Sequence, residues 1–183
     1  METGTTGREY GTSIHITALD GIVNVNSLFT FAVFVGLAWN PKDPSYSLVD
    51  SADTACVPSD NIAEDLIAFH VYSFSSFLFS SLVALCLKQA LRISGSFDAH
   101  RVRLLEHVNI NKTALRVGSL VSGAGSVCGC LFLMLALVNV AQIKLGTLAC
   151  GSPYTYAAVV PLVILVPVAL LVYVCVVLHA FTR

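Results

Sequence analysis

Polar side chains inside long apolar stretches are the residues of this sequence with the greatest capacity for chemistry. Asn24 and Asn26 lie in one such stretch, and His70 lies in a second. Asparagine, serine and histidine can hydrogen-bond between helices, or they can line a water-filled path or sense pH. Interhelical bonding is the favoured interpretation, because one small bundle has too few residues to enclose a pore. The polar stripe that these residues define consists of Asn24, Asn26, Ser27, Thr30, His70 and Ser73.

Sequence motifs of catalysis and of cofactor binding are missing. The chain has no phosphate-binding loop, zinc-protease motif, dinucleotide fingerprint or serine-hydrolase elbow. Cys128 and Cys130 are separated by one glycine, which is neither a zinc-site nor a thioredoxin spacing, so we interpret them as packing residues. The aspartates of residues 40–65 do not follow a calcium-loop pattern. We therefore expect a non-enzymatic protein without catalytic, cofactor-binding or metal-binding residues.

Composition places these residues in a membrane protein. Of the 183 residues, 56% are hydrophobic and only 11% are charged, whereas a soluble domain carries about 25% charged residues. The mean hydropathy is +0.79. The net charge of −1 gives no basic excess that would indicate nucleic acid. We expect one integral membrane domain in contact with the lipid bilayer, in the plasma membrane or an endomembrane.

Four apolar stretches are long enough to cross a bilayer as helices, which takes about 20 residues each. They predict an all-α fold, an integral membrane four-helix bundle that occupies residues 1–183. Residues 1–20 are polar and are expected to form a short mobile arm. The predicted spans are residues 22–39, 66–87, 117–140 and 156–181.

The third span has the clearest packing signal. It contains no charge, and its first half carries a stripe of small residues that recur at helical spacing. In lipid, small residues allow a neighbouring helix to approach closely. We therefore expect this span to be the helix against which others pack, within the chain or in other membrane proteins. The stripe consists of Gly118, Ser122, Gly125 and Gly129.

Charge distribution predicts the orientation. Four spans place both termini on the same side as residues 88–116, and that side then carries eight of the ten lysines and arginines. Because basic residues favour the cytosolic side, we expect both termini and this loop in the cytosol, and loops 40–65 and 141–155 in the lumen or outside the cell. The loop's middle is either a surface helix or an ordinary connection, and the loop could bind anionic lipid. Its basic residues are Lys88, Arg92, Arg101, Arg103, Lys112 and Arg116.

Two cysteines lie outside the apolar stretches. Cys56 and Cys150 fall in the two loops that the charge distribution places on the oxidising side of the membrane. They could form a disulfide that joins these loops. The alternative, two separate thiols, remains open because a shared side does not establish proximity.

Two segments of the chain resemble a known family. The runs HITALDGIVNVNSLFTFAVFVGLAWNP (His15 to Pro41) and LVSGAGSVCGCLFLMLALVNVAQIKLG (Leu120 to Gly146) are similar to a plant family of small multipass membrane proteins named for a maternal-effect embryo-arrest phenotype. The resemblance covers most of the chain. It implies a plant source, a multipass membrane location and a developmental role. The family has no defined catalytic or binding motif, so no residue roles follow from it.

Two functional hypotheses follow from these patterns. The first is a non-enzymatic scaffold or accessory subunit that binds other membrane proteins, or a second copy of itself, through helix packing. The alternative is an oligomeric channel lined by polar residues of the first two spans. Neither requires a cofactor or nucleic acid.

Overall fold

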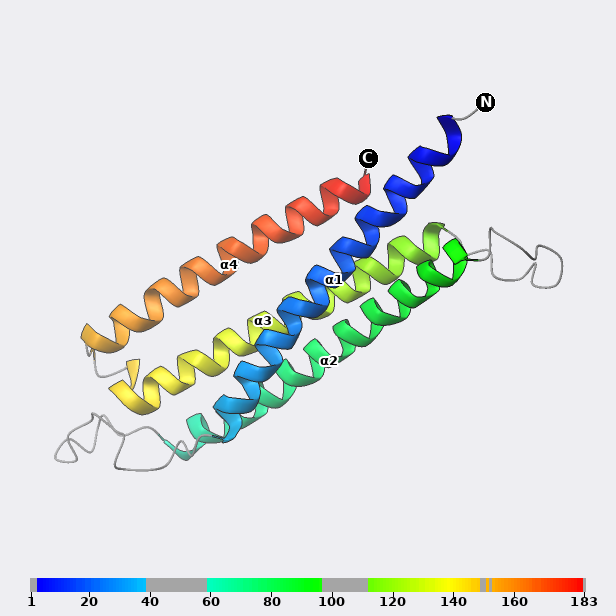
Figure 1. The fold of residues 1–183 in the computed structure, drawn as a ribbon. Helices are drawn as coiled ribbons and strands as arrows, with labels where there is room; N and C mark the ends of the chain where they lie inside the picture. Colours follow the sequence, from blue (N-terminus) through cyan, green and yellow to red (C-terminus); the bar gives the residue numbers. More distant parts are fainter. Residues whose placement is uncertain (1–2, 39–58, 97–111, 149–150, 152, 183) are drawn as a thin grey trace. The chain divides into compact units, whose positions relative to one another are not determined.

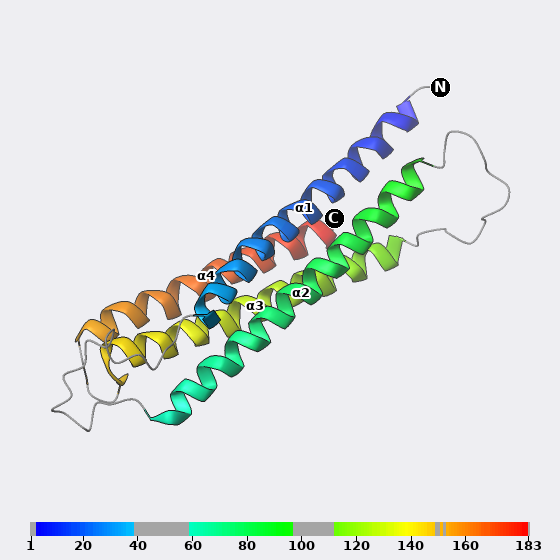
Figure 2. The same cartoon turned by 60° about the horizontal axis from the view of Figure 1, so that its bottom comes forward.

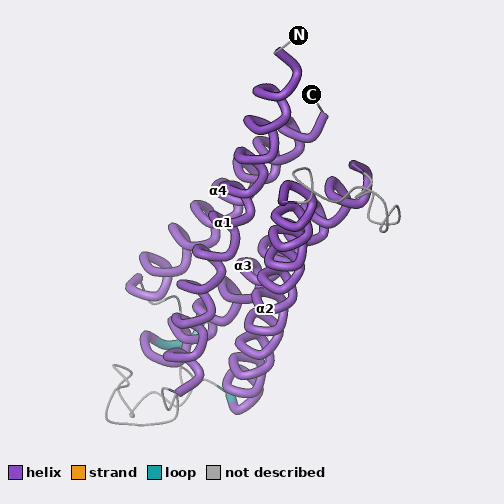
Figure 3. The backbone as a smooth tube through the Cα atoms, turned by 45° about the vertical axis from the view of Figure 1, so that its right-hand side comes forward, coloured by secondary structure: helices purple, strands orange, loops and turns teal. Residues whose placement is uncertain are grey.

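The protein is all-α in the residues that a computed structural model describes, which are 3–38, 59–96, 112–148, 151 and 153–182. Four helices occupy these ranges, and no strand occurs in them (Figures 1 and 3). The helices are α1 (Thr3–Ala38), α2 (Asp60–Ser96), α3 (Lys112–Leu145) and α4 (Pro153–Thr182).

Each helix contains a stretch that is long and apolar enough to cross a membrane, as predicted. The stretches are longer than expected for α2 and α3, with 33 and 31 residues. At about 1.5 Å of rise per residue, both exceed the roughly 30 Å of a bilayer's hydrocarbon core. The stretches run over Ile16–Gly36, Asp60–Arg92, Leu115–Leu145 and Pro153–Val176.

The N-terminal part of α1 differs from the prediction. Residues 1–20 were expected to form a mobile arm, which is wrong because α1 begins at Thr3. The physical reason lies at its inner face, where Leu19 is buried and Ile16 packs beside it against α2. An apolar stripe thus extends the helix on the N-terminal side of the predicted span, which begins at residue 22.

Buried positions on α2 repeat at alternating intervals of three and four residues. This seven-residue period keeps one face of a helix turned toward its neighbours, as in left-handed helix packing. Half of these side chains are alanine or serine, and such small residues allow helices to approach closely. The buried residues are Ala63, Leu66, His70, Ser73, Phe77, Ser80, Ala84 and Leu91.

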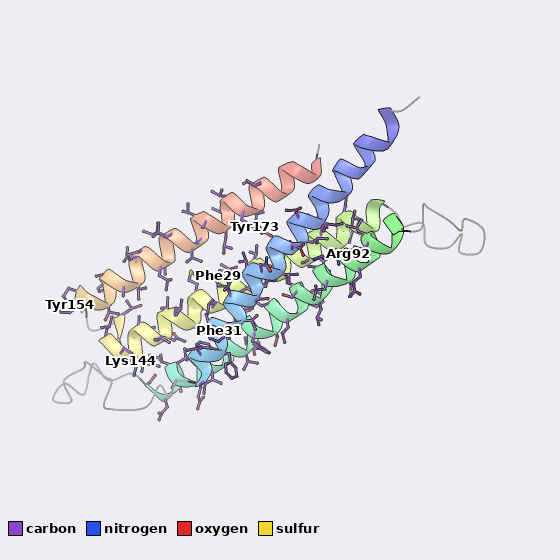
Figure 4. The ribbon with its side chains drawn as sticks, in the orientation of Figure 1. Phe29, Phe31, Arg92, Lys144, Tyr154 and Tyr173 are labelled. Atoms are coloured by element: carbon purple, nitrogen blue, oxygen red, sulfur yellow. The ribbon has the colours of Figure 1, made fainter. Side chains whose placement is uncertain are left out.

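The described residues divide into two compact units, and each helix from α1 to α3 contributes to both. The first unit comprises Met1–Phe29 and Phe77–Ser126. Its apolar core joins Leu19 of α1 to Ala84 and Leu91 of α2. Phe29 of α1, which is labelled in Figure 4, stacks on Phe77 of α2 with ring centroids 5.4 Å apart.

The second unit comprises Thr30–Ser76 and Val127–Arg183. Its core joins α2 to α3, and the ring of Phe132 packs with Phe69 and Tyr72 at centroid distances of 6.3 and 5.4 Å. α3 ends at Leu145, and the next residue, Gly146, has a φ of 96°, a conformation that glycine adopts without strain. The Thr155 hydroxyl of α4 then donates to the freed carbonyl of Gly146 at 3.1 Å. The rest of α4, drawn in orange and red in Figure 2, is largely exposed and contains Pro161 and Pro167.

Candidate functional site

The site with the most concentrated polar chemistry is a set of four buried side chains in the first unit, which we name the serine–asparagine cluster. It consists of Asn26 from α1, Ser80 from α2, and Ser122 and Ser126 from α3. Asn26 is only 1% exposed, and Ser80 and Ser122 are fully buried. Three helices therefore meet at one polar point within an otherwise apolar surrounding.

Asn26 uses both ends of its carboxamide in this cluster. Its Nδ2 donates to Ser80 Oγ at 2.8 Å, and its Oδ1 accepts from Ser126 Oγ at 2.8 Å. The same side chain thus joins α1 to α2 and to α3. Both bonds lie within the usual range of strong hydrogen bonds.

Ser80 and Ser122 form a reciprocal pair between α2 and α3. Ser80 Oγ donates to the Ser122 carbonyl at 2.7 Å, and Ser122 Oγ donates to the Ser80 carbonyl at 2.8 Å. Ser80 Oγ also lies 2.9 Å from Ser126 Oγ. Since Ser80 has one hydroxyl proton and the Ser126 proton is directed at Asn26, the Ser80 proton is divided between the Ser122 carbonyl and the Ser126 hydroxyl. Every hydroxyl of the cluster therefore has a partner.

Small residues on α3 make this close approach possible. Ser119, Ser122 and Ser126 are buried on one face of the helix. Gly118 lies beside this face, and a Cβ atom there would lie 2.8 Å from Leu87 Cδ2 of α2. A larger residue at Gly118 would have to displace the Leu87 side chain of α2.

The predicted small-residue stripe coincides only in part with the face of α3 that is buried in the structure. Of its members Gly118, Ser122, Gly125 and Gly129, the second and fourth are buried and the other two are half-buried. The buried serines next to the half-buried glycines are Ser119 and Ser126. This face, which was expected to pack against a helix of the chain or of another membrane protein, contacts α2 of the same chain.

An ion pair lies near the cluster in the first unit. Lys88 Nζ of α2 contacts Asp20 Oδ1 of α1, with side chains 19% and 41% exposed. Both residues lie within the stretches able to cross a membrane. Pairing is the usual condition for charges at such depth, because an isolated charge in hydrocarbon is costly.

The predicted polar stripe is divided between two sides of α1. Asn26 hydrogen-bonds to a serine of the second span, whereas Asn24 and Ser27 are exposed and Thr30 is half-buried. Ser27 Oγ donates to the Val23 carbonyl of its own helix at 2.8 Å. Only Asn26 of these four therefore points into the polar cluster.

His70 and Ser73 are buried in the second unit and also serve packing. Ser73 Oγ donates to the Gly129 carbonyl of α3 at 2.8 Å. His70 Nδ1 lies 2.8 Å from the Leu66 carbonyl and must donate to it, because a carbonyl only accepts. Gly36 of α1 makes room for this ring, since a Cβ there would lie 2.6 Å from His70 Nε2.

The basic loop is shorter than predicted. Lys88 and Arg92 belong to α2, which continues to Ser96, while Lys112 and Arg116 belong to α3. Apolar side chains around Lys88, such as Leu87 and Leu91, pack in the first unit and continue the helix past the expected end. Arg101 and Arg103 lie outside the described residues, and so do Cys56 and Cys150, so the disulfide stays a prediction.

Sequence reasoning omitted two residues that the structure brings into contact with the other helices. Ser126 bonds to Asn26 in the cluster, and Asp20 pairs with Lys88. A signal for Ser126 was present, because Ser119, Ser122 and Ser126 follow the four-and-three spacing of the buried face. No comparable signal identifies Asp20.

Metal binding finds no support in the described ranges, where no group of three or more histidine, cysteine, aspartate or glutamate side chains could hold an ion. The cluster itself offers neutral amides and hydroxyls. None of these groups is activated by an adjacent base, which a nucleophile needs. The arrangement suits structural hydrogen bonding between helices.

Comparison with known proteins adds no relative to this description. No protein-family model, no curated protein and no solved structure matches the chain. The plant-family resemblance therefore rests on the quoted segments alone and stays an expectation. The conclusion that the described residues support is an integral membrane protein with four helices able to span the bilayer.

Proposed function

We propose that this chain is a non-enzymatic membrane scaffold or accessory subunit. The single observation that carries the proposal is the serine–asparagine cluster, whose hydrogen bonds hold three helices together. Interhelical hydrogen bonds in membranes contribute about 0.6 kcal/mol each on average and up to roughly 1.7 kcal/mol. These bonds fix the positions of α1, α2 and α3 in the first unit, so that a partner protein can bind to a defined surface.

The alternative function, a channel, receives less support from the same geometry. A water-filled path needs polar atoms that face the water, but both ends of the Asn26 carboxamide are used by serines. Ser73 likewise donates to a backbone carbonyl. These bonds favour interhelical packing over a pore lining.

Orientation and lipid contact form part of the proposal. Basic residues near the span ends favour a cytosolic side that includes both termini and residues 97–111. Lys88 contacts Asp20, whereas Arg92 and Arg116 are exposed. These two arginines are therefore the described candidates for anionic lipid, and vesicles with and without phosphatidylserine test this contact.

The resemblance to the plant embryo-arrest family supports a developmental role as a further element of the proposal. In such a role the scaffold would hold a membrane assembly together during embryo growth. The plasma membrane and the endomembranes are both compatible with it. Fluorescent tagging of the full chain distinguishes the two locations.

The test of the proposed function is purification of the tagged full chain in mild detergent, with partners identified by mass spectrometry. We expect other membrane proteins to co-purify in stoichiometric amounts with the wild type. Fewer should co-purify with Asn26→Leu, because this change removes the hydrogen bonds from α1 to α2 and α3. Ser27→Ala is the matched control, because its hydroxyl bonds only within α1. Ion flux through liposomes with no partner in the purification would favour the channel and contradict the scaffold.

A further inference from the structure

An asparagine on the outer side of α1 makes no hydrogen bond to another residue within the part of the chain that the structure describes. Asn24 is exposed, and the membrane-capable stretch Ile16–Gly36 surrounds it. Asn26 is the middle residue of that 21-residue stretch, so Asn24 lies about 3 Å of helix rise from its centre. Water is missing at this depth, and an unpaired carboxamide there is costly.

The exposed Ser27 and Ser75 and the half-buried Ser76, in the membrane-capable stretches of α1 and α2, form hydrogen bonds within their own helix. Each donates to the carbonyl four residues earlier, at 2.8 to 2.9 Å. Asn24 makes no such bond to any residue that the structure describes. Its carboxamide is therefore available to a partner beyond the described residues.

The surroundings of Asn24 suit the approach of a second helix. Gly21 and Leu28 lie three residues before and four residues after it, on the same face of α1. A Cβ atom at Gly21 would meet nothing within 4 Å, and Leu28 is 72% exposed. Glycine allows close backbone approach, and a polar residue within an apolar seam fixes the register of paired helices.

We propose that a second copy of this chain docks on the face formed by Gly21, Asn24 and Leu28. A carboxamide carries both a donor and an acceptor, so two Asn24 side chains related by a two-fold axis satisfy each other. This self-complementarity identifies the same surface of another copy as the fitting partner. The face carries no charged residue, and its contact would leave the serine–asparagine cluster untouched.

The inference deepens the proposed function by naming a partner, and it rests on the membrane placement of that proposal. It does not depend on the presence of other bound proteins. Dimerisation and partner capture are therefore separate measurements.

The test measures energy transfer between donor- and acceptor-labelled full chains in liposomes as lipid dilutes them. We expect wild-type dimers, about tenfold weaker association for Asn24→Leu, and partial recovery for Asn24→Gln, which retains the carboxamide. Ser27→Ala should associate like the wild type. Loss of association in both Asn24→Leu and Ser27→Ala, or equal association of Asn24→Leu and the wild type, would overturn the proposal.

A second measurement keeps Asn24 intact and so does not depend on how its variants fold. A photo-reactive amino acid replaces Leu28 in one chain and Leu165 of α4 in another, two leucines that are 72% and 65% exposed. We expect cross-links between copies from position 28 and few from position 165. Equal or missing cross-links at position 28 refute the dimer, even if other membrane proteins still co-purify and uphold the scaffold.

Discussion

Replacement of Asn26 by leucine should destabilise the fold through the loss of two interhelical hydrogen bonds. The side chain is 1% exposed, and a leucine of similar volume removes both its donor and its acceptor. At about 0.6 to 1.7 kcal/mol for each bond, the free energy of unfolding should fall by about 1 to 3 kcal/mol. The loss should be accompanied by weaker contact between α1 and the other two helices.

The assay is equilibrium unfolding of the full chain in lipid bicelles, followed by circular dichroism. Ser27→Ala is the matched control on the same helix, because the Ser27 hydroxyl bonds to the Val23 carbonyl on the exposed side. Surface changes of this kind alter stability by less than about 0.5 kcal/mol. The comparison separates the interhelical bonds from a general effect of removing a polar group.

The reasoning fails if Asn26→Leu and Ser27→Ala unfold with the same free energy. Equal values would mean that the carboxamide contributes nothing to the joint between α1, α2 and α3. A gain in stability for Asn26→Leu would be a stronger contradiction.

Two further predictions concern neighbouring contacts. Gly118→Leu should lower the free energy of unfolding by about 1 to 3 kcal/mol, because a Cβ atom there would lie 2.8 Å from Leu87 Cδ2. Gly21→Ala should change the free energy of unfolding of the monomer by less than about 0.5 kcal/mol, because a Cβ atom there meets nothing within 4 Å. Thermal unfolding in detergent measures both variants, and equal effects would contradict the packing of Gly118 against Leu87. Lys88→Met should cost about 1 kcal/mol or more by leaving Asp20 unpaired, and the added change Asp20→Asn should restore part of the loss. No recovery in the double variant would show that the ion pair does not stabilise the first unit.

Hydropathy predicted the four helices well, because each span is long and almost free of charge. Hydropathy failed at the limits of the predicted spans, where one face of the helix is polar and the opposite face is apolar. Leu19 and Leu91 show this most clearly, since both are buried beyond the expected limits of spans one and two. A span length from hydropathy thus gives a lower bound on the helix.

The candidate site was harder to predict, because a periodic pattern on one helix does not say which face meets a neighbour. Asn24 and Asn26 are chemically alike and two residues apart, which rotates them about 200° around the helix axis. One is buried in the cluster and the other is exposed. On α3 the same ambiguity led to the assignment of Gly118 to the packing face, whereas Ser119 is the more deeply buried residue.

Hydrogen exchange of the Asn26 carboxamide tests most directly whether water is excluded from the serine–asparagine cluster. Selective ¹⁵N labelling of asparagine in lipid nanodiscs, with Asn26→Leu to assign the signal, follows its two side-chain protons after transfer to heavy water. We predict that these protons persist while the signal of Asn61, which is exposed at the start of α2, decays. Complete exchange of Asn26 within the dead time of the experiment would show that water reaches the cluster and would contradict the account.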